Sequence, residues 1–176
     1  CWSDIEVCID NSYSTSDLVE ERDATGQKME SAYCINDLIR HTAKAVAGSI
    51  QGTGSRVGFS SFDDRVVSVA PLTVVTADNC NSVMSQIDNV RPRGGTNIWQ
   101  GCRHAMKNLL TRSDKSRNPA VLLLTDGQPN QGTNKPENEA VVQLLTNPPE
   151  DWGCDSPYPA GRIPIYSIGF GYALKK

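Results

Sequence analysis

The chain has 176 residues, of which 38% are hydrophobic and 21% charged, and its net charge is −3. This size and composition are typical of one soluble domain, so we expect a single domain over residues 1–176; because no initiating Met is present, we expect it to be part of a larger protein. The negative charge argues against a nucleic acid partner bound through its phosphates, and no apolar run is long enough for direct membrane insertion.

Apolar periodicity and helix or strand breakers divide the chain into alternating strands and helices. In chain order we expect a strand at 4–10, a helix at 32–50, strands at 56–62 and 65–70, helices at 77–90 and 97–110, a strand at 120–125, a helix starting at Pro136 and a strand at 163–168. Alternation of this kind predicts an α/β fold: an open three-layer arrangement with a mainly parallel sheet, one antiparallel strand and helices on both faces.

Local features refine three of these elements. Glu6 and Cys8 share the second face of the first strand, which argues against burial of that strand on both sides. A polar stretch at 15–31, with a turn at Gly26, delays the first helix. Pro71 is expected to end the strand at 65–70, because proline cannot donate a ladder hydrogen bond.

Five oxygen-bearing side chains occur where strands or loops give way to the next element. The carboxyl ends of parallel strands share one edge of a sheet, and ligand sites form there. Two carboxylates, three hydroxyls and water make a hard oxygen shell, which suits Mg²⁺. The candidate metal ligands are Asp10, Ser12 and Ser14 after the first strand, Thr96 in Gly94-Gly95-Thr96-Asn97, and Asp126 in Leu124-Thr125-Asp126-Gly127.

This set of Asp-x-Ser-x-Ser, Thr and Asp-Gly, in this order and at these separations, resembles the von Willebrand factor A domain family and its metal-ion-dependent adhesion site. The resemblance covers nearly the whole chain and implies the Rossmann-like fold of that family. Members usually continue past the fifth strand through a helix, an edge strand and a last helix. Residues 172–176 are too short to supply these, so we expect a domain trimmed at this end or a fold that closes differently.

The resemblance also implies a function. Ser12, Ser14 and sometimes Thr96 would bind the cation directly, whereas Asp10 and Asp126 would act directly or through water. A sixth position would stay open for an Asp or Glu carboxylate of a partner protein. We therefore expect a protein-binding module that uses Mg²⁺, or else Mn²⁺ or Ca²⁺; the alternative is an assembly domain whose ion only holds the loops together.

Residues within the site segments have more than one interpretation. Gly94 and Gly95 allow the loop to approach an ion closely, and Gly127 permits a sharp turn after the strand. Tyr13 stands where the family often has glycine, and either rims the site or lies on the surface. Trp99 either packs in the core, which we favour, or contacts a ligand at the rim.

Charged residues near the same edge also have two interpretations. Asp63 and Asp64 have the chemistry of a tight turn. Arg91 and Arg93 either steer acidic ligands or are solvated charges, and we favour the latter. The insert at 15–31 lies next to the site; a solvated loop is favoured over a partner contact.

The cysteines are widely spaced and lack the Cys-x-x-Cys and histidine pairs of a zinc site. Several fall at apolar positions, so we expect mostly reduced, buried thiols, with one or two bridges involving Cys1 or Cys154 as the alternative. Their number and spacing leave the compartment open. The six are Cys1, Cys8, Cys34, Cys80, Cys102 and Cys154.

An enzyme is the weaker alternative, in the form of a Mg²⁺-dependent phosphoryl hydrolase. A phosphatase-type nucleophile at Asp10 needs a second Asp two residues on, and Ser12 stands there. The sequence has neither a Gly-x-Ser-x-Gly elbow nor a Gly-x-x-x-x-Gly-Lys phosphate loop. Its two histidines, His41 and His104, fall within predicted helices away from the site segments.

Overall fold

The computed structural model describes residues 2–29, 31–112, 114, 116–127, 130–131, 137–152 and 163–171. The strands are β1 (Ser3–Asp10), β2 (Glu21–Arg22), β3 (Lys28–Met29), β4 (Arg56–Phe62), β5 (Val66–Val74), β6 (Asn118–Thr125) and β7 (Ile165–Gly169). Five of them form one sheet in the order β5-β4-β1-β6-β7. Its pairs are parallel except for β4 with β5, which confirms the predicted mainly parallel sheet.

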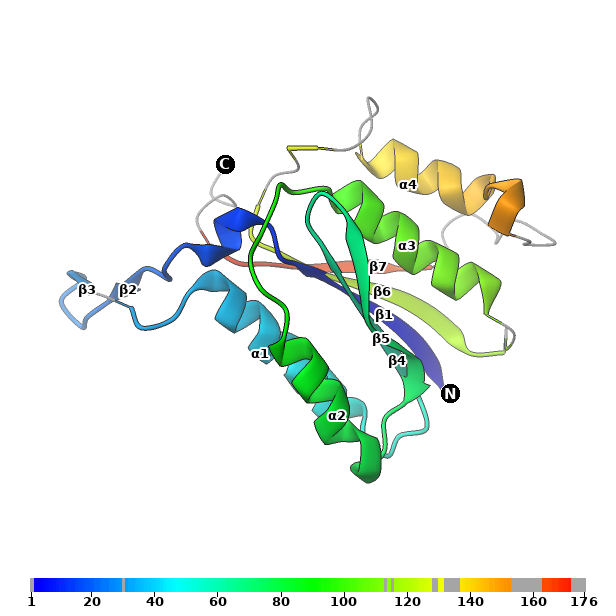
Figure 1. Cartoon of the computed structure of the whole chain (residues 1–176), viewed down its shortest axis with the longest axis horizontal. Helices are drawn as coiled ribbons and strands as arrows, with labels where there is room; N and C mark the ends of the chain where they lie inside the picture. The colour runs from blue at the N-terminus through cyan, green and yellow to red at the C-terminus, as the bar shows by residue number, and fades with distance from the viewer. Residues whose placement is uncertain are drawn as a thin grey trace.

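Helices cover both faces of this sheet, as predicted. Helices α1 and α2 lie on one face, and α3 and α4 lie on the other (Figure 1). The helices are α1 (Ile35–Ile50), α2 (Ala77–Asp88), α3 (Ile98–Thr111) and α4 (Glu137–Thr146), with short 3-10 turns η1 (Tyr13–Ser16) and η2 (Glu150–Trp152). The predicted α/β fold is therefore confirmed.

The central strand β1 is buried on both faces. Val7 and Ile9 belong to the core under α1 and α2, whereas Cys8 belongs to the core under α3, because alternate side chains point to opposite faces. The expectation that Glu6 keeps one face of this strand open is wrong: Glu6 is 1% exposed. Gly58 lies opposite Glu6 on β4, and a Cβ there would stand 2.5 Å from Glu6 Oε1, so glycine makes room for the carboxyl group.

Strand β5 does not end before Pro71, as the sequence suggested, but continues to Val74. Two register irregularities accompany this stretch, between Val57 and Phe59 and between Phe59 and Ser60 of β4. Strand β5 is an edge strand, where proline and bulges are tolerated because no further strand needs the missing N–H.

The first helix begins later than predicted, at Ile35 rather than near residue 32. The residue before it, Cys34, is extended and forms an isolated antiparallel bridge with Leu18. This bridge closes the base of a projecting segment, residues 17–33, which we call the arm. Strand β6 also begins earlier than predicted, at Asn118.

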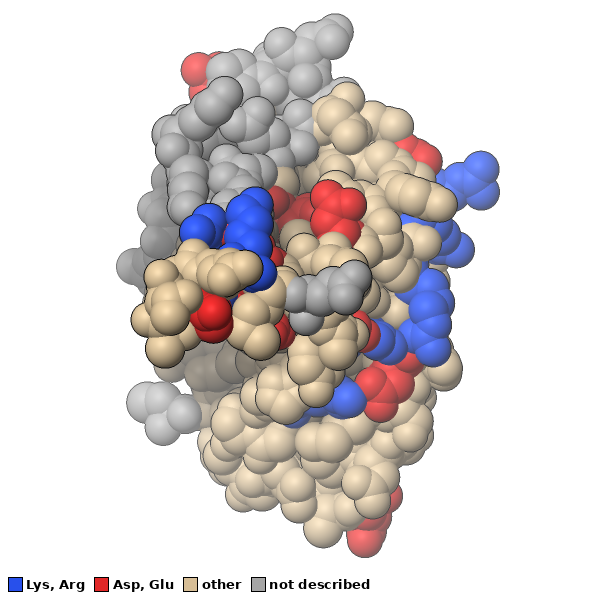
Figure 2. All heavy atoms as spheres, turned by 90° about the vertical axis from the view of Figure 1, so that its left-hand side faces the viewer, with Lys and Arg blue, Asp and Glu red and all other residues tan. Residues whose placement is uncertain are grey.

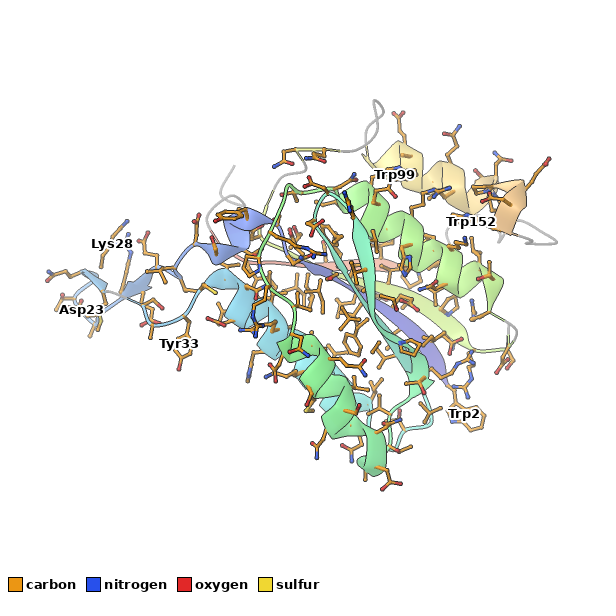
Figure 3. The ribbon with its side chains drawn as sticks, viewed as in Figure 1. Trp2, Asp23, Lys28, Tyr33, Trp99 and Trp152 are labelled. Carbon is orange, nitrogen blue, oxygen red and sulfur yellow. The ribbon has the colours of Figure 1, made fainter. Side chains whose placement is uncertain are left out.

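The arm contains the short antiparallel hairpin β2–β3 and projects away from the sheet, with Asp23 and Lys28 near its tip (Figure 3). Gly26 has a φ of 85° and occupies the predicted turn. Asp23 Oδ1 accepts hydrogen bonds from the backbone N–H groups of Thr25 at 2.8 Å and Gln27 at 2.9 Å, so the tip is held by local contacts. A short exposed hairpin thus replaces the expected irregular loop.

Three cysteine side chains, those of Cys8, Cys80 and Cys102, are buried thiols, as expected, and Cys34 is a half-buried thiol. Burial raises the pKa of the Cys8 thiol well above its usual value. Cys1 and Cys154, the candidates for a bridge, lie outside the described residues, as do residues 172–176. Among the described helices, none has the length and apolar character needed to cross a membrane.

Candidate metal centre

Two of the five predicted ligands sit side by side where parallel strands end. Asp10 is the last residue of β1, and Asp126 directly follows β6. The two strands are paired in register, with Ile9 opposite Leu124. The last residue of β6, Thr125, donates a 2.6 Å hydrogen bond from its hydroxyl to Asp10 Oδ2. Strand pairing therefore brings both carboxylates to one edge of the sheet, as the sequence predicted.

The two serines connect these carboxylates. The Ser12 backbone N–H donates to Asp10 Oδ1 at 2.9 Å, the Ser12 and Ser14 hydroxyl oxygens are 3.1 Å apart, and the Ser14 hydroxyl donates to Asp126 Oδ1 at 3.1 Å. The turn η1 fixes this arrangement, because the Thr15 hydroxyl donates to Ser12 O at 2.7 Å. Four of the five predicted ligands thus form one hydrogen-bonded chain.

Thr96 reaches the same edge through its backbone. Its loop is joined to the first segment by hydrogen bonds from Tyr13 N to Gly94 O at 3.0 Å and from Arg93 N to Asn11 O at 2.7 Å. On the other side, Thr96 N donates to Asn130 Oδ1 at 2.8 Å. Thr96 is 3% exposed. Within the described part of the chain, its hydroxyl forms no hydrogen bond with the other four side chains, so the contacts of its loop, and not of its own side chain, place it at this edge.

At two of the three glycine positions noted in the sequence, the geometry leaves no room for a side chain. Gly94 has a φ of 63°, and a Cβ at Gly94 or Gly95 would lie 2.6 Å or 2.7 Å from the carboxylate oxygens of Asp64. Gly127 differs: its φ is not positive and a Cβ there would meet no atom within 4 Å. Gly127 therefore shows no steric requirement for glycine among the described residues, as in an ordinary turn.

The two carboxylates are buried next to each other. Asp10 is fully buried and Asp126 is 5% exposed. No lysine or arginine in the described ranges forms an ion pair with either of them. Burial first, and then the nearby charge of Asp10, raise the pKa of Asp126 to about 6, although the Ser14 hydrogen bond lowers it.

The donor set of this edge is carboxylate and hydroxyl oxygen rather than nitrogen or sulfur. Among the described residues, no three or more His, Cys, Asp or Glu side chains lie together in a way that could hold a metal ion by themselves. Paired acids with neighbouring hydroxyls match the hard oxygen ligands of Mg²⁺, Mn²⁺ and Ca²⁺, and not the imidazole and thiolate ligands typical of zinc. The residues present therefore fit a hard divalent cation.

Comparison with known proteins identifies the family of the chain. Residues 4–176 match the model of the von Willebrand factor type A domain. The chain belongs to this family. Domains of the family are typically adhesion or interaction modules, usually without catalytic activity, and often bind a divalent cation. No curated protein matched the sequence.

Solved structures resemble the domain in fold. The PilB minor pilin from Streptococcus sanguinis is 25% identical with a TM-score of 0.56, and the match covers 74% of this chain and 31% of that one. A von Willebrand factor type A protein from Catenulispora acidiphila is 16% identical with a TM-score of 0.66, and the match covers 96% of this chain and 33% of that one. Proximal thread matrix protein 1 from the mussel byssus is 20% identical with a TM-score of 0.66, and the match covers 97% of this chain and 38% of that one. The domain thus spans about a third of each of these solved chains.

Sequence reasoning missed two residues that shape the site. Thr125 holds Asp10, and its only sequence signal is a hydroxyl at the end of an apolar strand, directly before Asp126. Asn11 is 2% exposed, and its Nδ2 donates to Asp63 Oδ2 at 3.3 Å and to Arg91 O at 3.1 Å. It lies between Asp10 and Ser12, at a position that the Asp-x-Ser-x-Ser motif leaves unspecified, so the motif gave no reason to select it.

The aspartates after β4 do more than form a turn. Asp63 Oδ1 accepts from Arg65 N at 2.8 Å, as turn chemistry predicts, but its Oδ2 also pairs with Arg93. Asp64 Oδ1 accepts from Gly95 N at 2.9 Å. Both acids therefore position the loop that carries Thr96.

The remaining aromatic and basic residues follow the favoured interpretations only in part. Trp99 is half-buried against the core under α3, in agreement with a packing role (Figure 3). Tyr13 is 70% exposed. Arg91 and Arg93 are exposed, but they are not simply solvated, because Arg91 donates to main-chain carbonyls at the end of α2 and Arg93 pairs with Asp63.

Proposed function

We propose that this domain binds a partner protein through a divalent cation, Mg²⁺ in the first place, held by Asp10, Ser12, Ser14, Thr96 and Asp126 as a metal-ion-dependent adhesion site. The observation that carries the proposal is a pair of buried carboxylates with no paired lysine or arginine in the described chain, linked by two serine hydroxyls. Burying like charges without compensation is costly, so this edge of the sheet is built for an external cation.

The site residues differ in charge and in exposure to solvent. Asp10, Ser12, Thr96 and Asp126 are buried, whereas Ser14 and its neighbour Tyr13 are exposed. The site therefore opens to solvent on the Tyr13–Ser14 side, and a partner approaches there. With two carboxylates and otherwise neutral hydroxyl donors, a bound divalent cation supplies the positive field that attracts a carboxylate, although the domain has a net charge of −3.

The hydrogen bonds around the site favour a binding role over a purely structural one. The Thr96 loop is already joined to the first segment through Gly94 and Arg93, and to the segment after β6 through Asn130. These contacts need no ion to hold the loops together. A cation whose only task was to join them would duplicate bonds that the protein makes itself.

Isothermal titration with Mg²⁺ tests the cation site. We expect binding heat for the wild type and none for Asp126→Asn, because the variant loses one of two anionic donors and keeps the hydrogen-bond acceptor for Ser14. Asp78→Asn is the matched control, since Asp78 is an exposed acid in the first turn of α2 and should leave the heat unchanged. Equal heats for the wild type and Asp126→Asn would reject the site.

The binding role is tested separately with an acidic probe. Acetyl-Gly-Gly-Asp-Gly-Gly-amide should bind the Mg²⁺-loaded domain and not the chelated domain, and its Asn counterpart should bind neither. If chelation lowers the melting temperature while peptide binding stays the same, the ion is structural and the adhesion proposal is wrong.

A further inference from the structure

A hollow of about 480 Å³ adjoins the proposed cation site. It lies between the β4–β5 pair and the end of α2, and valines line part of its wall. Asn11 belongs both to this hollow and to the segment between Asp10 and Ser12. The Arg93 N–H donates to Asn11 O at 2.7 Å, so the hollow and the site share a wall.

Every charged side chain that lines this hollow among the described residues is an arginine. Arg91 uses its Nη1 for the main-chain oxygens of Asp88 and Val90, and Arg93 uses its Nε for Asp63. The other two nitrogens of each guanidinium form no hydrogen bond with any described residue. The Arg93 side chain is 59% exposed. Donors that match a carboxylate therefore remain available. Figure 2 shows Lys and Arg side chains gathered along one flank of the face at this end of the molecule.

One residue that lines the hollow also carries an unused acceptor. Asn11 is 2% exposed, and its Oδ1 accepts no hydrogen bond from any residue that the structure describes. The amide orientation is fixed, because the groups next to Nδ2 are Asp63 Oδ2 and Arg91 O, which are both acceptors. A buried acceptor without a partner is costly, and a donor from a ligand would satisfy it. A peptide N–H is a donor of this kind.

We propose that this hollow is a second anchoring point for the partner, taking an acidic residue of the same segment whose other acid binds at the cation site. Arg91 and Arg93 hold the second carboxylate, and Asn11 Oδ1 accepts a main-chain N–H of the segment. The inference rests on the proposed function. It specifies the partner further, as a protein segment with two acidic residues a short distance apart.

Peptides with one and two acids test this second anchoring point. We compare acetyl-Gly-Gly-Asp-Gly-Gly-amide with peptides of the same type, extended with glycine, that carry a glutamate one to four residues before or after the aspartate. In Mg²⁺, the best two-acid peptide should bind the wild type about three- to tenfold more tightly than the one-acid peptide, as expected for an added charge pair at a partly exposed site.

The double variant Arg91→Gln/Arg93→Gln should lose this gain and keep its affinity for the one-acid peptide. Lys107→Gln, an exposed charge on α3 across the sheet, is the matched control and should keep the gain. Removing Arg93 also breaks its pair with Asp63, which lies next to the Thr96 loop. If the double variant loses one-acid binding as well, Arg91→Gln alone must reduce the gain, because it leaves that pair intact.

The outcomes separate this inference from the proposed function. Mg²⁺-dependent binding of the one-acid peptide with no gain from a second acid overturns the second anchoring point and leaves the adhesion site. A gain from the second acid that persists in chelator and is lost in the arginine variants supports the hollow and rejects the cation bridge. Failure of every peptide to bind in either condition overturns both.

Discussion

The buried aspartates near the two ends of β1 have opposite kinds of partner. Asp4, near the amino end, is fully buried and accepts 2.8 Å and 2.7 Å hydrogen bonds from Arg56, with Arg112 Nε at 2.7 Å and Arg117 Nε at 4.0 Å. Asp10, at the carboxyl end, is equally buried but lies beside Asp126, and it accepts hydrogen bonds from the Thr125 hydroxyl and the Ser12 backbone N–H. One strand thus carries one acid compensated by arginine and another surrounded by neutral donors.

This difference separates a compensated acid from an uncompensated one. A buried charge is tolerated when a counter-charge accompanies it. At the amino end, the protein supplies the counter-charge itself. At the carboxyl end, the neighbouring group is a second carboxylate, and no lysine or arginine among the described residues pairs with either acid. Compensation, rather than burial or residue type, is therefore the criterion by which we propose Asp10, and not Asp4, as a cation ligand.

Removing the compensated acid should have the largest effect on stability. Asp4→Asn leaves Arg112, whose side chain is 3% exposed, without its carboxylate. Breaking a buried pair on one side costs about 3–5 kcal/mol, so we expect a loss of that size in the free energy of unfolding. Chemical denaturation measures it. Asp114→Asn is the control, because this acid is 41% exposed in its pair with Arg117 and its loss should be far smaller. Equal losses would contradict the comparison.

Glu6, between the two ends, should give stability an unusual pH dependence. Burial, and to a lesser degree the charge of Asp4, raise its pKa from 4.5 to about 7, partly opposed by a hydrogen bond from Asn108. The folded state then holds a proton that the unfolded chain releases. Stability should therefore fall as pH rises from about 4.5 to 7, by about 3 kcal/mol, and level off above it.

Denaturation at several pH values, for the wild type and Glu6→Gln in one buffer series with chelator, isolates this contribution. The amide keeps the size of the side chain and does not titrate, so the difference between the two proteins should carry the slope. Asp126 contributes in the same direction in both proteins and cancels in this difference. A difference that does not change with pH would show that Glu6 is ionised in the fold.

Replacing one of the uncompensated acids should have the smallest effect on stability, and the sign of this effect should reverse when Mg²⁺ is added. In chelator, Asp126→Asn relieves repulsion from Asp10 and should stabilise the domain by about 1–2 kcal/mol, the size usual for a single replacement. With Mg²⁺ at a hundredfold excess over its Kd, the wild type should gain about 2.7 kcal/mol and the variant less. Thermal melts with and without Mg²⁺ measure both. A variant less stable than the wild type in chelator would contradict the proposed repulsion.

Much of this molecule was predictable from local pattern. The uninterrupted apolar run before Asp126 predicted a central strand, and β6 pairs on both sides. Parallel pairing then made Asp10 and Asp126 neighbours, because such strands end at one edge. Pro71 was misjudged, because its effect depends on whether its strand lies at the edge of the sheet, and that position follows from strand order, which local periodicity does not encode.

Local patterns were enough to predict the order of strands and helices and the oxygen-rich segments at the strand ends, because side-chain periodicity and turn chemistry act over a few residues. Which acids are compensated, in contrast, depends on the packed fold. Asp4 meets Arg56 and Arg112, and Asn11 meets Asp63 and Arg91, over separations of about 50 to 110 residues, and helix α3 buries Glu6. Contacts over such distances depend on how the helices pack on the sheet. Whether a buried acid has a counter-charge can therefore be judged only when all of its neighbours in the folded structure are known.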